Sequence, residues 1–184
     1  MSDFIILGRL TDEVTNAAIA VDWSHYMVHE GLFFRSGMNY SLANGNVATF
    51  GLTTPSDGKL MHLEWDLSAS ADGTFTVVED VTSFSGGAAV TPLNHNRGSL
   101  NVSKATCIRG MTGVELVEAT GGTTILTATL STGKGSTIDR SLEQEFILKQ
   151  NCKYLFQYTN GTSANVIRLV LEWYEHITRT SFGV

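Results

Sequence analysis

Two histidines four residues apart, His25 and His29, are the first residues whose spacing suggests chemistry. On a helix, this spacing lets two imidazoles bind one metal ion. The flanking Tyr26-Met27-Val28 and Gly31-Leu32-Phe33-Phe34 instead predict a strand over 26–34, where side chains four apart lie about 13 Å from each other. Glu30 also does not directly follow the first histidine, as a zinc-protease helix motif requires. The sequence therefore favours structural roles for both histidines and predicts no metal site.

The densest polar cluster is Asn94-His95-Asn96-Arg97-Gly98-Ser99. Such a cluster can bind a sugar, a peptide or a neighbouring subunit. Equally, asparagine and glycine favour turn conformations, and an arginine can tie a loop to a carboxylate. Both interpretations stay open, so His95, Asn96 and Arg97 are candidates either for an interface or for ordering the loop.

The flat apolar ring of a tryptophan can stack on a sugar, and the chain has three tryptophans. Trp65 and Trp173 fall in apolar rows of predicted strands, which favours a place in the core. Trp23 belongs to no such row. It is therefore the candidate for stacking on a ligand.

Other reactive patterns are incomplete. Gly133-Lys134-Gly135-Ser136-Thr137 lacks the spacing and the following helix of a phosphate-binding loop. No Gly-x-Ser-x-Gly elbow is present, and the acidic residues are scattered. A small β-sandwich hydrolase would need converging acids or a metal that the sequence does not display. We therefore predict a non-enzymatic protein with no cofactor. Cys107 and Cys152 are expected to be free thiols, with one disulfide as the alternative.

Period-two alternation identifies the elements that must position these residues. Between Lys59 and Leu67 alternate residues are apolar, and a second apolar row follows the turn at Ala71-Asp72-Gly73. The two rows are Met61, Leu63, Trp65 and Leu67, then Phe75, Val77 and Val81. This pattern predicts a hairpin with one dry face and one wet face.

The C-terminal third repeats the pattern around the turn signal Asn160-Gly161-Thr162. The apolar rows are Tyr154, Phe156 and Tyr158, then Ile167, Leu169, Leu171 and Trp173. The opposite face of the last strand is only half polar. A mixed face of this kind is expected to contact another sheet or another chain.

Weaker strands are predicted at 47–53, 100–108, 123–130 and 144–149, a long loop at 83–93, and one short helix at 12–21. Eight or nine strands in one domain predict an all-β sandwich of two sheets, with at most one short helix. The expected organisation is an N-terminal arm at 1–19, a β-sandwich domain at 20–177 and a C-terminal tail at 178–184.

Composition agrees with this fold class. The 184 residues include 22 Thr, 18 Gly and 16 Ser, which suit strands and turns, and only 2 Pro. The net charge of −6, with 12 Lys+Arg against 18 Asp+Glu, disfavours binding to nucleic acid or to an anionic membrane. No apolar run is long enough for a transmembrane helix, and the N-terminus lacks the pattern of a secretory signal.

Each end of the chain carries apolar residues without an obvious local partner. Met1 to Arg9 and Thr178 to Val184 are therefore candidate arms that dock on a neighbouring molecule, with an ordinary edge strand or a frayed end as the alternative. The candidate contact residues are Phe4, Ile5, Ile6, Leu7 and Phe182.

Five segments together resemble a family of tailed-bacteriophage virion proteins, described as head decoration or structural proteins. They are residues 20–31, residues 60–65, Asn94-His95-Asn96-Arg97, residues 145–155 and Trp173-Tyr174-Glu175-His176. Their order and spacing, rather than any single segment, carry the resemblance. It spans residues 20–176.

The resemblance implies a capsid decoration, or cement, protein that binds the major capsid protein on the outer head surface after assembly in the host cytoplasm. It also implies a jelly-roll-like homotrimer. A carbohydrate- or receptor-binding module of a phage tail or fibre is the alternative, because a jelly roll serves lectins as readily as capsids.

Overall fold

The computed structural model describes residues 23–131, 136–139, 145–162 and 164–177. The predicted arm at 1–19, the predicted helix at 12–21 and the predicted tail at 178–184 lie outside these residues. So do the apolar contact candidates in both arms. Within the described part of the chain, no helix is long and apolar enough to cross a membrane.

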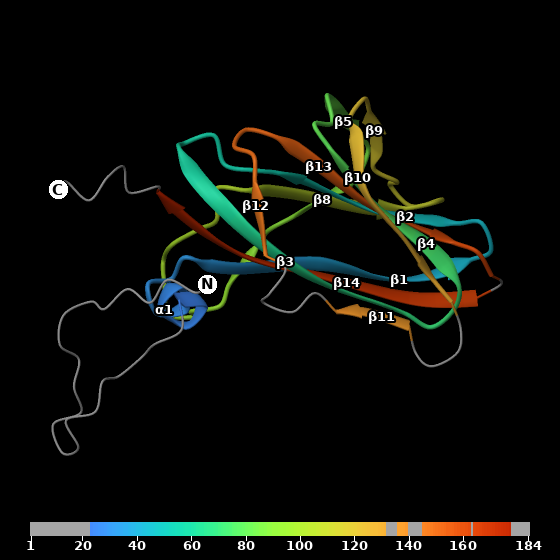
Figure 1. Ribbon diagram of the computed structural model, residues 1–184, viewed down its shortest axis with the longest axis horizontal. Coiled ribbons are helices and arrows are strands. Elements are labelled where there is room, and N and C mark those ends of the chain that lie inside the picture. Colours follow the sequence, from blue (N-terminus) through green and yellow to red (C-terminus); the bar gives the residue numbers. More distant parts are fainter. Residues whose placement is uncertain (1–22, 132–135, 140–144, 163, 178–184) are drawn as a thin grey trace, which may run out of the picture.

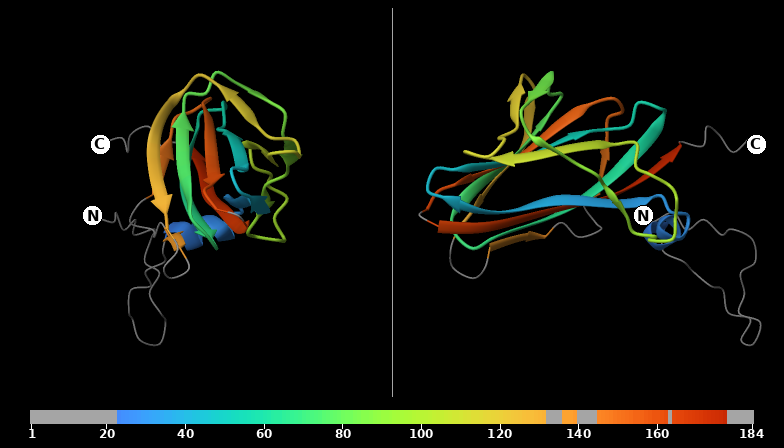
Figure 2. Two further views of the ribbon diagram at one scale, coloured as in Figure 1. Left: turned by 90° about the vertical axis from the view of Figure 1, so that its right-hand side faces the viewer. Right: turned by 180° about the vertical axis from the view of Figure 1, so that it is seen from behind.

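Two six-stranded antiparallel sheets pack face to face, which confirms the predicted all-β sandwich (Figures 1 and 2). The first sheet has the order β11-β3-β14-β1-β7, and β12 also pairs with β3. The second has the order β10-β4-β13-β2-β8-β6, and β5 pairs with β9 as a separate ribbon. β1, β2, β3 and β4 alternate between the two sheets, and so do β10 and β11, and β13 and β14, as in a jelly roll.

The strands of the first sheet are β1 (Phe33–Ala43), β3 (Lys59–Ala69), β7 (Leu93–Asn94), β11 (Ser136–Asp139), β12 (Phe146–Leu148) and β14 (Ala164–Ile177). Those of the second are β2 (Val47–Thr53), β4 (Gly73–Glu79), β6 (Ala88–Val90), β8 (Thr106–Met111), β10 (Thr123–Leu130) and β13 (Lys153–Asn160). The ribbon consists of β5 (Ser83–Ser85) and β9 (Glu118–Thr120). One helix, α1 (Trp23–His29), lies at one end of the sandwich (Figure 1).

The predicted hairpin at 59–81 is wrong. The last two strands, on either side of the turn at Asn160-Gly161-Thr162, also do not pair with each other. β3 and β4 belong to opposite sheets, as do β13 and β14, so each turn connects the two layers. The reason is that alternation fixes only which face of a strand is buried. Two strands that face each other across a core have the same pattern as two strands that are hydrogen-bonded side by side.

The predicted apolar rows form the core. Residues 61, 63, 65 and 67 of β3 and 167, 169, 171 and 173 of β14 are at most 3% exposed. The opposing layer contributes Phe50, Phe75, Phe156 and Tyr158, each fully buried. Trp65 and Trp173 are therefore core residues, as predicted. Cys107 and Cys152 are separate free thiols, and burial raises the pKa of Cys107 to about 12.

A buried amide network closes the turn end of the sandwich. Asn165 is 2% exposed, and its Oδ1 accepts from the backbone N–H groups of Ser70 and Ala71 at 2.9 and 3.0 Å. Its Nδ2 donates to the Tyr158 hydroxyl at 2.7 Å and to Asn160 Oδ1 at 3.1 Å. Because buried amides must be satisfied, this network holds both inter-sheet turns in one arrangement.

Other boundaries also differ from the prediction. The expected strand at 26–34 is wrong, because α1 covers 23–29 and the strand runs from 33 to 43. The predicted loop at 83–93 contains β5, β6 and the start of β7. These short pieces contain too few residues for alternation to emerge. The predictions at 47–53 and 123–130 match β2 and β10 at both ends.

Candidate functional site

Helix α1 ends in a Schellman motif. Gly31 has a φ of +67°, the N–H of Leu32 bonds the carbonyl of Met27 at 2.9 Å, and the N–H of Gly31 bonds that of Val28 at 3.0 Å. Glycine reaches this left-handed conformation without strain, which is why it so often follows the last helical turn. Gly31 was therefore the sequence signal for this helix.

Three asparagine amides hold the end of α1. Asn94 Nδ2 donates to the carbonyl of Gly31 at 2.8 Å. Asn96 Nδ2 donates to that of His29 at 3.1 Å, and Asn101 Nδ2 donates to that of Glu30 at 3.1 Å. We call Asn94, Asn96 and Asn101 the asparagine clasp. The clasp satisfies carbonyls that a helix leaves without partners at its C-terminal end, and so fixes α1 against the sandwich.

The three candidates in the polar loop therefore have different roles. Asn96 orders the loop and the helix, because its Oδ1 also accepts from the N–H of Gly98 at 3.1 Å. His95 packs edge-on against Phe33, with ring centroids 4.7 Å apart, and its Nε2 lies 3.5 Å from Glu172 Oε1. Arg97 is exposed, and its guanidinium donates to the carbonyl of Asn94 at 3.5 Å.

A chain of side chains that we call the histidine relay lies beside α1 and consists of Glu145, His62 and His176. His62 Nδ1 lies 2.8 Å from Glu145 Oε1, and His62 Nε2 lies 2.8 Å from His176 Nε2. His176 Nδ1 lies 3.1 Å from the carbonyl oxygen of Ile177. The rings of His62 and Tyr174 stack with centroids 4.6 Å apart. β3, β14 and the segment that leads into β12 thus meet in one polar row.

The end groups of the relay are acceptors. An ionised Glu145 and the carbonyl of Ile177 can only accept, whereas each ring nitrogen donates or accepts according to the tautomer. The Tyr174 hydroxyl also lies 3.0 Å from His62 Nδ1. The contact of 2.8 Å between the two Nε2 atoms needs a hydrogen on one of them.

Two groups of the relay have shifted pKa values. Burial lowers the pKa of His176. Burial acts to raise the pKa of Glu145, but hydrogen bonds from His62 and Tyr174 outweigh it and the pKa is lowered. The relay therefore places an ionised carboxylate beside two imidazoles.

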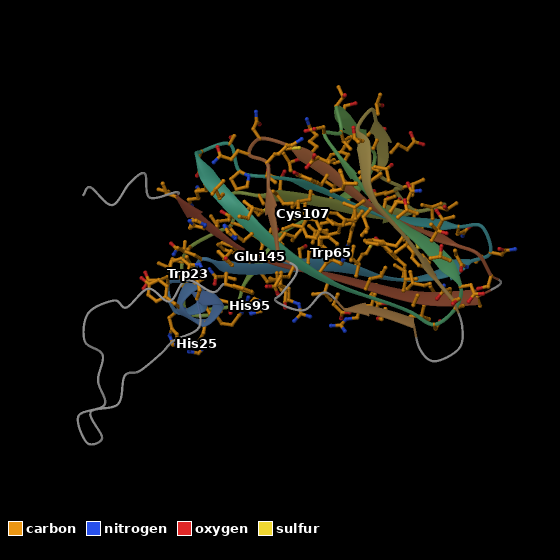
Figure 3. All side chains as sticks on the ribbon, in the orientation of Figure 1. Trp23, His25, Trp65, His95, Cys107 and Glu145 are labelled. Atoms are coloured by element: carbon orange, nitrogen blue, oxygen red, sulfur yellow. The ribbon has the colours of Figure 1, made fainter. Side chains whose placement is uncertain are left out.

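Trp23 packs on this relay from α1. Its ring meets that of His176 edge-on at 6.4 Å and that of Tyr26 at 5.5 Å. Figure 3 shows Trp23 on the side of α1 toward the strands, and His25 on the side away from them. Trp23 is half-buried rather than fully exposed, so part of its ring is used inside the protein.

The predicted separation of His25 and His29 is wrong. Because they lie on α1 and not on a strand, their Nε2 atoms are 3.0 Å apart. Among the described residues, no group of three or more histidines, cysteines and acids could hold a metal ion. Lys134 and Gly135 of the loop at 133–137 lie outside those residues.

Sequence reasoning missed Glu175, which is 1% exposed. Its carboxylate accepts from Trp173 Nε1 at 3.1 Å, from Ser103 Oγ at 2.5 Å and from the N–H of Lys104 at 3.0 Å. The sequence signal was its position two residues after Trp173, which places an acid in the same row of alternate residues. An acid in such a row indicates a buried anchor with several donors.

No family model matches the sequence, and no curated protein matches it at a significant level. The resemblance to phage virion proteins therefore stays a prediction. Residues from all five segments that carry it meet at the α1 end of the sandwich. His62, Glu145, Trp23 and His176 meet in the relay and its cover, and Asn94 and Asn96 clasp α1 beside them.

Proposed function

We propose that this chain is a non-enzymatic virion protein, a capsid decoration protein that binds the major capsid protein on the outer surface of a phage head. The observation that carries the proposal is the convergence of the five resembling segments. They are scattered over residues 20–176, yet they build one end of the sandwich. A shared spatial cluster supports a common structural ancestry better than scattered similarity does.

The sandwich suits the mechanism that this function needs. A protein that binds only the assembled lattice stabilises that lattice by mass action, by about 2.7 kcal/mol per site when its concentration is 100 times Kd. In a homotrimer, weak contacts of each copy add through effective concentration. A rigid core of fully buried aromatic residues, such as Phe50 and Phe156, keeps the binding surfaces in register.

The test is to mix purified protein with undecorated, expanded capsids of the phage that encodes it. We expect saturable binding and a higher temperature of capsid disruption. Absence of binding contradicts the proposal. Light scattering of the free protein at micromolar concentration tests the trimer separately, since a monomer contradicts that part alone.

A receptor- or carbohydrate-binding module of a phage tail is the second candidate, and the partly exposed pair of Trp23 and Tyr26 favours it. Binding on a glycan array or to host cells, lost in Trp23→Ala, supports this candidate. Labelling of the virion in electron micrographs separates the two, because decoration predicts signal on the head and the alternative predicts signal on the tail.

A further inference from the structure

One long edge of the first sheet is open. β14 pairs with β1 along residues 33–43, whereas β7 pairs with β1 only at Phe34 and Arg35. The carbonyl of Phe33 accepts from the N–H of His95, and that of Gly37 accepts from Arg109 on β8. Because strand groups alternate in direction, the odd-numbered residues of β1 present their N–H and C=O groups to this edge. Beyond Arg35, no described strand pairs with them.

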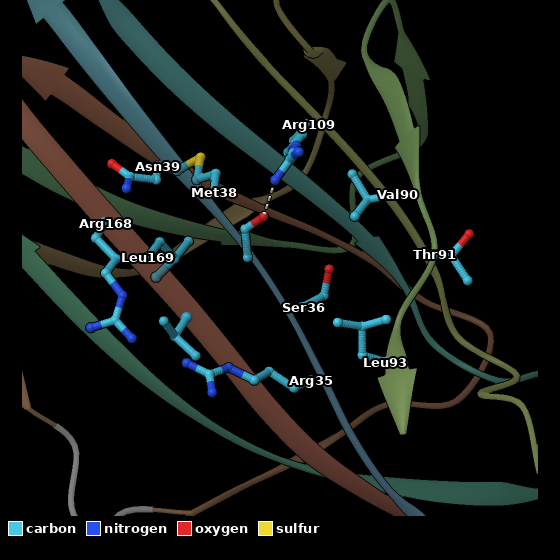
Figure 4. A pocket seen from close by; sticks show the side chains of 12 residues that line it. Arg35, Ser36, Met38, Asn39, Val90, Thr91, Leu93, Arg109, Arg168 and Leu169 are labelled. Atoms are coloured by element: carbon cyan, nitrogen blue, oxygen red, sulfur yellow. Dashed lines mark hydrogen bonds between the residues drawn. The ribbon is translucent and has the colours of Figure 1, made fainter. Parts of the chain in front are cut away.

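A groove of about 410 Å³ runs along this edge (Figure 4). β1 forms one wall, and the chain from Val90 to Leu93 forms the other. Gly37 lies in the groove, and a side chain there would collide with the backbone carbonyl of Leu169 on β14, so this position needs glycine. The groove is therefore a slot beside unpaired strand groups, which is the setting in which an extended chain can add to a sheet.

The charge of the groove is one-sided. Arg35, Arg109 and Arg168 line it, and none of the described residues that line it is acidic, in a chain whose net charge is −6. Glu172 lies 3.6 Å from Arg35, and Asp66 lies 3.8 Å from Arg168. These long, partly exposed ion pairs bind their arginines weakly. Arg109 gives one N–H to Gly37, and its remaining donors stay available for a second acceptor.

We propose that this groove binds an extended acidic segment of a partner protein, which adds as a strand to the free edge of β1 between Gly37 and Ser41. Backbone hydrogen bonds to β1 supply affinity, and carboxylates that meet the three arginines supply selectivity. A second copy of this chain fits less well, because joining two such edges brings two sets of arginines together. The inference rests on the proposed function, since a capsid subunit would supply the segment.

The direct test uses two synthetic peptides in fluorescence anisotropy, Thr-Glu-Val-Glu-Val-Thr and its match with glutamine at both acidic positions. We expect saturable binding of the acidic peptide, binding at least tenfold weaker for the glutamine peptide, and weakening by salt. The double substitution Arg35→Gln and Arg168→Gln should reduce binding at least tenfold. Its matched control, Arg97→Gln with Lys104→Gln, removes the same charge elsewhere and should bind as wild type.

A backbone variant tests strand addition itself. Asn39→Pro removes one N–H from the free edge while it leaves the ladder to β14 intact, because the N–H of residue 39 points away from β14. We expect weaker peptide binding with the circular dichroism spectrum unchanged. If this variant does not fold, the arginine pair and its control decide the outcome.

Three results overturn the inference: equal binding of both peptides, acidic binding that survives the loss of Arg35 and Arg168, or self-association through the β1 edge. A protein that binds capsids but not the acidic peptide keeps the proposed function and loses this inference. A protein that binds the peptide but not capsids keeps this inference and loses the proposed function.

Discussion

The α1 end of the sandwich and the free edge of β1 differ in how far their polar groups are hydrogen-bonded within the chain. At the α1 end, the asparagine clasp bonds three consecutive carbonyls, and the histidine relay joins a carboxylate to two imidazoles at 2.8 Å. Along the edge beyond Arg35, no described strand pairs with β1, and the ion-pair partners of Arg35 and Arg168 lie at 3.6 and 3.8 Å. In the first region these polar groups have close partners within the chain, and in the second they do not.

This difference separates residues that build the protein from residues that meet a partner. Polar groups that are fully bonded within the fold gain little from a ligand, because a ligand would have to replace good hydrogen bonds with others. Partly bonded arginines beside an open strand gain from a partner. Substitutions at the α1 end should therefore change stability, and substitutions along the β1 edge should change binding.

The largest effect is expected at Glu175. Replacing it with alanine leaves Trp173 Nε1 and the N–H of Lys104 buried without their acceptor, which should lower the free energy of unfolding by roughly 3 kcal/mol. Urea denaturation measures this loss. The matched change Glu172→Ala, on the outer face of the same strand, should cost less than about 1 kcal/mol. Similar losses for both variants would remove Glu175 as an anchor.

A smaller effect is expected in the clasp. Asn96→Ala removes the bonds to the carbonyl of His29 and the N–H of Gly98, and should cost about 1 kcal/mol. Arg97→Ala, one residue further, should change stability by less than about 0.5 kcal/mol. Thermal unfolding followed by circular dichroism compares the two. Equal shifts in Tm would show that the loop does not hold α1 in the way described.

The relay should make stability fall on acidification. Because the folded-state pKa of His176 is lowered, its contribution is complete above the unfolded value near 6.5 and is lost as pH falls through the folded value. The pKa of Glu145 is also lowered, so its contribution is lost at still lower pH, below about 4.3. The unfolding free energy measured between pH 8 and 3 should decline in this order.

Glu145→Gln sharpens that test. The variant keeps the shape of the side chain but loses the carboxylate, so the lower-pH part of the decline should shrink while the part near pH 6 stays. The matched substitution Glu118→Gln, on an exposed strand, should leave the profile unchanged. A wild-type profile that is flat from pH 7 to 3 contradicts a contribution of the relay to stability.

The smallest effect on stability is expected in the groove. Arg35→Gln with Arg168→Gln should change the free energy of unfolding by less than about 1 kcal/mol, because both ion pairs are long and partly exposed. Urea denaturation beside the wild type measures the change. A loss comparable to that of Glu175→Ala would place these arginines among the residues that build the fold, and would erase the contrast between the two regions.

Alternation in the sequence was enough to predict the sandwich and its buried rows, including Trp65 and Trp173, because burial of one strand face is a local property. It did not determine which sheet a strand joins. That choice depends on contacts such as Asn165 with Ser70 and Tyr158, which connect residues up to 95 positions apart.

The candidate site was predicted only in part. The polar loop was identified as a candidate. That Asn96 orders the loop while Arg97 is exposed depends on the end of α1, a segment that was predicted to be a strand. The relay was not predicted, because His62, Glu145 and His176 come together only when β14 lies beside β3 and the segment leading into β12 lies on the other side of β3. Two local signals could have been used. Gly31 indicated the end of a helix, and the place of Glu175 in the apolar row indicated a buried acid.

The most direct measurement of the central claim is co-sedimentation of the protein with undecorated capsids, with wild type, Arg35→Gln with Arg168→Gln, and Asn96→Ala compared at one temperature where all three are folded. The account predicts saturable binding of the wild type and of the Asn96 variant, and loss of binding in the arginine variant. Failure of the wild type to bind would contradict the proposed function. Undiminished binding of the arginine variant would contradict the assignment of the β1 edge as the surface that meets the partner.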